Sequence, residues 1–114
     1  MKKIILSLFF ISFLSANFDD GNKLYECGLE YQKGKVGNIN TNWAKSNFFL
    51  GYVIGVNDNE EILLFPNFCV PGGTSGGQLA DIVFRYLDNH PEERNQQGAV
   101  LVKKALQEVY PCSK

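Results

Sequence analysis

The chain has 114 residues, of which 45% are hydrophobic and 13% aromatic, and its formal net charge at pH 7 is −1. This length and composition suit one small domain with a packed core. Because acidic residues outnumber basic ones, we expect neither nucleic acid nor an anionic lipid surface as a partner.

The first 16 residues have the pattern of a secretory signal peptide. Lys2 and Lys3 precede an apolar run, Ile4–Leu14, that is too short to span a bilayer. The small pair Ser15–Ala16 follows, so we expect cleavage directly after it, a mature domain over residues 17–114 and a periplasmic location. An uncleaved membrane anchor is the alternative interpretation. After cleavage the formal charge becomes −3, and no later stretch predicts stable membrane insertion.

A first helix is expected over residues 22–32, where apolar residues are loosely spaced and Gly28 interrupts them. A polar loop rich in glycine, lysine and asparagine follows over residues 33–40. A second helix is then capped by Asn40 or Thr41.

The second helix has apolar residues near helical spacing and is expected to end in a polar turn at residues 57–59. Gly51 and Gly55 lie four residues apart on one side of it, which favours tight packing of another helix there. The next apolar run, residues 62–71, contains two prolines. We therefore expect an extended connector that is pressed onto the core.

The strongest helical pattern follows Ser75, which forms a capping box with Gln78. Apolar residues then recur at i, i+3, i+4, i+7 and i+8 up to a polar end at residues 88–90. Pro91 is expected to open the last helix, which continues to Tyr110. The glycines before Gln78 are not followed by the lysine of a phosphate-binding loop, so we interpret them as a turn.

Export would place Cys27, Cys69 and Cys112 in an oxidising compartment, where an odd number allows at most one internal disulfide. The last two helices predict an antiparallel hairpin, whose open ends carry Cys69 and Cys112. A bridge between these two cysteines would close the hairpin and contribute about 4 kcal/mol. The fold class is thus a small exported all-α domain of about four helices with a disulfide-closed C-terminal hairpin, and Cys27 is expected to be a free thiol.

No catalytic constellation is evident in the sequence, and we expect no enzyme activity. His90 is the single histidine and precedes a proline, which favours a cap or surface role over a catalytic base. Ser75 lacks a GxSxG context, and Cys27 has no nearby basic residue to activate it. One histidine and three scattered cysteines do not predict a metal site, and no cofactor is expected.

The second half of the chain resembles a known family. It contains a "GYVIGV" helix, "FCVP", a capped "GQL" helix ending in "YLDNHPEER", and a last helix ending in "YPC". From Phe49 to Cys112, this order resembles the Tai family of type VI amidase immunity proteins, including its Rap branch. The resemblance implies a small exported helical protein that binds and blocks a peptidoglycan amidase effector delivered by type VI secretion. Phe49 replaces a cysteine that is common in the family, which leaves Cys27 without its usual partner.

Two alternatives stay open beside the immunity role. One is a small periplasmic binding module, or an acid-stress chaperone that exposes apolar surface on acidification. The other is a small hydrolase, which the lack of a catalytic constellation disfavours. A homodimer also stays open.

The expected contact surface for a protein partner lies on two polar turns, because the apolar helix faces are committed to the core. These turns are "VNDNEE" at residues 56–61 and "DNHPEER" at residues 88–94. Their acidic side chains could enter an amidase cleft that contains a basic imidazole and backbone donors. The candidate partner-binding residues are Asp58, Glu60, Glu61, Asp88, His90, Glu92 and Glu93.

Overall fold

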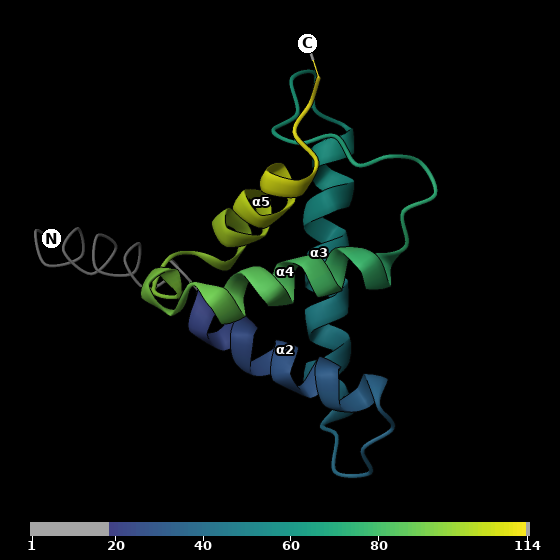
Figure 1. Ribbon diagram of the computed structural model, residues 1–114, viewed down its shortest axis with the longest axis vertical. Helices are drawn as coiled ribbons and strands as arrows, with labels where there is room; N and C mark the ends of the chain where they lie inside the picture. The colour runs from purple at the N-terminus through teal and green to yellow at the C-terminus, as the bar shows by residue number, and fades with distance from the viewer. Residues whose placement is uncertain (1–18, 114) are drawn as a thin grey trace, which may run out of the picture.

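The computed structural model describes residues 19–113, and this part of the chain is all-α (Figure 1). The predicted signal peptide, residues 1–16, lies outside the described residues. In chain order the elements are α2 (Gly21–Lys35), α3 (Trp43–Glu61), α4 (Gly76–Asn89), the 3-10 turn η1 (Pro91–Glu93) and α5 (Gly98–Val109). The prediction of a small all-α domain of about four helices is therefore confirmed.

Helix α3 organises the domain. Figure 1 shows it along the long axis of the molecule, and α2, α4 and α5 all pack against it. The core between the four helices is apolar and consists of Leu24, Cys27, Phe49, Val53, Phe68, Leu79, Ala80, Val83, Tyr86, Leu87, Leu101, Val102, Ala105 and Leu106. None of the described helices is long and apolar enough to cross a membrane.

Helix α2 is capped by Asp20, whose side chain accepts a hydrogen bond from the backbone N–H of Lys23 at 2.9 Å. Gly28 does not interrupt the helix. A Cβ at this position would lie 2.8 Å from Phe84 and 3.0 Å from Phe49, so glycine allows α3 and α4 to approach α2 closely.

Helix α3 begins one residue later than expected and is longer at its other end. Asn42, rather than Asn40 or Thr41, caps it by accepting from Lys45 N. The prediction that residues 57–59 form a polar turn is wrong, because the helix continues to Glu61. Asn57 lies one helical turn after Val53 and Glu60 lies two turns after it, and both side chains are buried. The inward face of α3 therefore carries polar residues near its end.

The two glycines of α3 do not mark a helix contact. A Cβ added at Gly51 or Gly55 would meet nothing within 4 Å, so no neighbouring helix packs tightly on this side. The expectation drawn from their spacing is therefore wrong.

The segment after α3 is only partly pressed onto the core. Its first four residues, Ile62–Phe65, are exposed, whereas Phe68 is only 3% exposed and joins the core. The prediction that this connector packs onto the core is correct for Phe68 and wrong for Ile62–Phe65.

Helix α4 begins with the predicted capping box. The Ser75 hydroxyl accepts from Gln78 N at 3.1 Å, and the Gln78 side chain accepts from Ser75 N at 2.7 Å. Both orphan amides at the start of the helix are satisfied in this way.

The connection between α4 and α5 is longer than expected. Pro91 opens only the short turn η1, and α5 begins at Gly98. The intervening backbone binds the start of α2 instead of forming a helix: Gly21 N donates to Gln96 O and Asn22 N donates to Arg94 O, both at 2.8 Å. These contacts tie the turn to α2 and prevent α5 from extending toward Pro91.

The disulfide Cys69–Cys112 is present, with a Cα–Cα distance of 4.9 Å. It joins the segment before α4 to the end of α5 across 43 residues, as the hairpin predicted. The backbone supports it, because Cys69 N donates to Tyr110 O at 2.9 Å.

Candidate functional site

The end of α3 presents a group of exposed apolar side chains, which we call the α3 tip and define as Ile62–Phe65. Ile62 is 80% exposed, and Leu64 and Phe65 are each 86% exposed. Leu63 is 40% exposed. A contiguous apolar surface of this kind is typical of an interaction site rather than of an ordinary loop.

Two carboxylates border the α3 tip. Asp58 and Glu61 are exposed and lie three residues apart, so they share one face of the last turn of α3. Asp58 precedes Ile62 by four residues and therefore lies beside it. Among the described residues, neither carboxylate forms an ion pair. The tip thus combines an apolar centre with an acidic edge.

Glu60 behaves differently from its neighbours and is not a surface residue. Its side chain is 1% exposed, so the expectation that it contacts a partner directly is wrong. One carboxylate oxygen accepts from Asn67 N, and the other lies 3.7 Å from Lys103 Nζ. The second oxygen has no hydrogen-bond partner among the described residues. Glu60 therefore binds the backbone that returns from the α3 tip.

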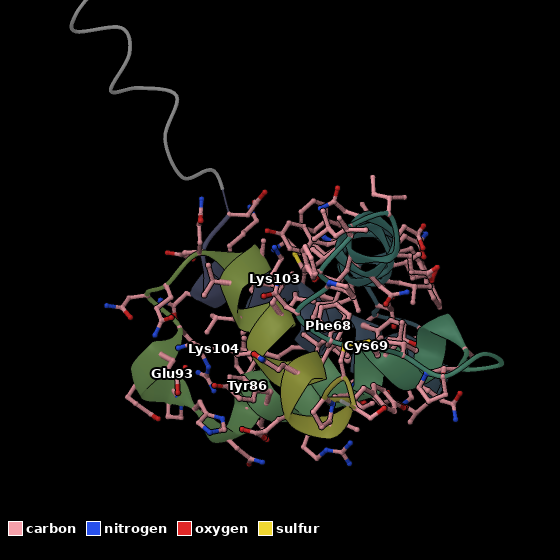
Figure 2. The ribbon with its side chains drawn as sticks, turned by 90° about the horizontal axis from the view of Figure 1, so that it is seen from above. Phe68, Cys69, Tyr86, Glu93, Lys103 and Lys104 are labelled. Carbon is pink, nitrogen blue, oxygen red and sulfur yellow. A yellow bond between two sulfur atoms is a disulfide. The ribbon has the colours of Figure 1, made fainter. Side chains whose placement is uncertain are left out.

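The turn between α4 and α5 is acidic, but most of its side chains have internal partners. Glu93 accepts from Tyr86 OH at 2.9 Å and from Lys104 Nζ at 3.2 Å, and Figure 2 shows these three side chains lying together. These hydrogen bonds lower the pKa of Glu93. Burial, followed by the bond to Glu93, raises the pKa of Tyr86 to about 12.

Of the other predicted residues of this turn, two form hydrogen bonds within the described part of the domain and one does not. Asp88 accepts from Tyr25 OH at 2.7 Å, and His90 Nδ1 lies 2.7 Å from Tyr86 O. Glu92 is exposed and forms no ion pair with another described residue. His90, Glu92 and Glu93 have ligand atoms within 4.8 Å of one another. The Glu93 carboxylate already accepts hydrogen bonds from Tyr86 and Lys104. These side chains therefore hold the turn together.

Cys27 is a free cysteine and is buried in the core. Burial raises the pKa of its thiol, so the thiolate needed for nucleophilic chemistry is disfavoured. Ser75 is likewise engaged as the cap of α4. The nucleophilic groups that the sequence singled out therefore have structural roles.

The structure brings the predicted residues together in two separate places, one at the end of α3 and one between α4 and α5 (Figure 1). Asp58 and Glu61 flank the α3 tip, whereas Asp88, His90, Glu92 and Glu93 form the α4–α5 turn. Sequence reasoning missed the tip itself, because a run of apolar residues favours burial. The sequence holds no local signal of its exposure, because a continuous apolar series such as Ile62–Phe65 is equally typical of a buried segment.

Comparison with known proteins identifies the family. No curated protein matches the chain. The family model of the Rap1a immunity proteins matches residues 20–112, which include all four described helices, the disulfide, the α3 tip and the α4–α5 turn. The chain therefore belongs to the Rap1a immunity protein family.

Proposed function

We propose that this protein is a periplasmic immunity protein that binds and inhibits a peptidoglycan amidase effector delivered by type VI secretion. The observation that carries the proposal is the family match over residues 20–112. The predicted signal peptide supports the location, and the resemblance of the second half of the chain to amidase immunity proteins supports the target.

Inhibition by occlusion agrees with the chemistry of the described residues. Cys27, Ser75 and His90 are engaged in the core or in caps and turns, so the chain offers binding surfaces rather than reactive groups. An amidase cleft with a cysteine–histidine pair contains a basic imidazole and exposed backbone donors. The exposed carboxylates of Asp58 and Glu61, or separately that of Glu92 in the α4–α5 turn, could meet such donors. Asp88, His90 and Glu93 shape the turn that presents Glu92.

The ionised carboxylates set the pH range over which the domain should stay folded. The pKa values of Glu26, Glu30 and Glu93 are all lowered by hydrogen bonds to partners within the domain. These contacts contribute stability above the ordinary carboxyl pKa, and it is lost only as the pH falls below that value. These carboxylates therefore give no reason for the domain to open in mild acid, above the ordinary carboxyl pKa of 4.5.

An inhibition assay tests the proposed function. The mature protein, residues 17–114, is titrated into a peptidoglycan digestion by the amidase effector encoded beside it. We expect digestion to stop at a one-to-one ratio and the purified pair to elute together from a sizing column. Full amidase activity at a large excess of the mature protein would contradict the immunity role.

A further inference from the structure

The α3 tip is an unusual use of apolar residues in so small a domain. Four consecutive apolar residues, Ile62–Phe65, stay exposed although the core lies a few residues away at Phe68. Burial of the tip against α5 would have been favourable for folding, because apolar area removed from water stabilises a protein. Contacts elsewhere in the chain must therefore keep these residues in the solvent.

Contacts on both sides of the tip hold its ends in place. At its start, Leu63 N donates to Glu60 O at 3.1 Å, and the buried Glu60 carboxylate accepts from Asn67 N. After it, Phe68 inserts into the core and Cys69 is tied to Cys112 at the end of α5. Figure 2 shows Phe68 and Cys69 side by side next to α5. The returning backbone is thus fixed on both sides of the exposed residues.

Burying the Glu60 carboxylate carries an unfavourable free energy. Taking a carboxylate out of water is unfavourable, and its ion pair with Lys103 is long at 3.7 Å. A buried ion pair of this kind is weak evidence for net stability, because the cost of desolvation can exceed the attraction between the charges. Glu60 is therefore best explained by the geometry that it gives to residues 62–67.

The charges around the tip indicate which kind of partner can bind it. Asp58 and Glu61 border it, and among residues 19–113 the one ion pair to this region is that of Lys103 with the buried Glu60. If two copies of the chain met tip to tip about a two-fold axis, these carboxylates would face one another, and like charges repel. An anionic lipid surface would be repelled in the same way. A protein cleft with an apolar floor and a basic edge is attracted.

We propose that the α3 tip, positioned by the buried carboxylate of Glu60, docks into an apolar, basic-edged cleft of the effector. This inference rests on the proposed immunity function and assigns its contact surface. Leu64 and Phe65 enter the cleft, Asp58 and Glu61 face its basic edge, and Glu60 is a positioning residue that touches no partner atom.

A matched pair of double variants tests the contact. Leu64→Asp with Phe65→Asp changes the tip, and Val36→Asp with Ile39→Asp changes two residues that are 82% and 94% exposed at the other end of α3. Both pairs are solvated, so circular dichroism should show folded proteins. We expect the tip variant to bind the effector about a hundredfold more weakly, as buried apolar anchors do, and the control to bind as the parent does.

The outcomes separate the two proposals. If the parent binds the effector and the tip variant binds it equally well, the docking inference is wrong and the immunity function still stands. A parent dimer, measured by ultracentrifugation, that dissociates in the tip variant without a change in effector binding would assign the tip to a second copy and also overturn it. Tip-dependent sedimentation with phosphatidylglycerol vesicles, again with effector binding unchanged, would do the same. A parent that binds no effector would refute the immunity function itself.

Variants of Glu60 test its positioning role. Glu60→Ala removes the acceptor for Asn67 N, so we expect faster hydrogen exchange at Asn67 and about tenfold weaker effector binding. Glu60→Gln keeps an acceptor of the same shape and should restore both. Equal losses in the two variants, or no loss in either, would contradict a role in positioning.

Discussion

The α3 tip and the α4–α5 turn show two ways in which a small domain arranges its surface. Both segments follow a helix, and both contain acidic residues that the sequence marks as exposed. In the turn, Asp88 and Glu93 accept hydrogen bonds from Tyr25 and Tyr86, so their charge is used to fix the domain. At the tip, Asp58 and Glu61 form no ion pair with any residue in the described part of the chain. A charged residue is available for binding only where the fold leaves its hydrogen bonds unsatisfied.

Loss of the disulfide should produce the largest effect and should act on the tip more than on the turn. Replacing Cys69 and Cys112 by serine removes a bridge that spans 43 residues, and we expect the free energy of unfolding to fall by about 4 kcal/mol. Urea unfolding measures the loss, and hydrogen exchange should rise at residues 66–70 more than at residues 88–94. A larger rise at residues 88–94 would contradict the separate anchoring of the two regions.

Charge reversal at single exposed carboxylates should separate the regions in binding. Glu61→Lys at the tip should slow association with the amidase effector about tenfold at low salt, because favourable charges speed encounter. Glu92→Lys in the turn should change the rate by less than about twofold, since the turn lies far from the proposed contact. Stopped-flow measurements at low and high salt would check both values. Equal effects of the two variants would show that binding depends only on net charge.

Much of the fold could be predicted because its signals are local. The capping box at Ser75 and Gln78, the apolar spacing of α4 and the hairpin ends that carry Cys69 and Cys112 all follow from short stretches of sequence. The end of α3 could not be predicted in this way. Asn57 and Glu60 are polar residues that usually mark turns or solvent, and only the tertiary structure shows that they face inward. The start of α5 at Gly98 likewise depends on backbone hydrogen bonds to α2.

The candidate site was predicted less completely than the fold. Asp58 and Glu61 were identified from their charge, but the apolar tip beside them was expected to be buried. Glu60 before Ile62–Phe65, and Phe68 and the disulfide after it, are tertiary contacts that the local sequence does not show. Hydrophobicity alone cannot show that a segment is held away from the core.

Removal of the α4 cap provides a reference that should affect neither region. Ser75→Ala deletes the side-chain acceptor for Gln78 N, and we expect a loss of about 1 kcal/mol in the free energy of unfolding. Effector binding at a temperature where the variant is folded should equal that of the parent. Weakened binding by the folded variant would place the partner on the loop before α4.

The smallest expected effect is a change in alkaline stability, and it should be confined to the α4–α5 turn. The pKa of Tyr86 is raised from 10.0 to about 12 in the folded protein. The folded state therefore holds the phenol proton more tightly than the unfolded state, and this contribution is complete below the unfolded pKa of 10.0 and is lost as the pH rises toward 12. Tyr86→Phe has no proton to lose, so its free energy of unfolding should decline less than that of the parent between pH 10 and about 12. Urea titrations across this range provide the measurement, and the tip variant Leu64→Asp with Phe65→Asp is the control, which should decline as the parent does. If Tyr86→Phe declined in parallel with the parent, the hydrogen bond to Glu93 would not hold the turn in solution, and the contrast between an engaged turn and a free tip would fail.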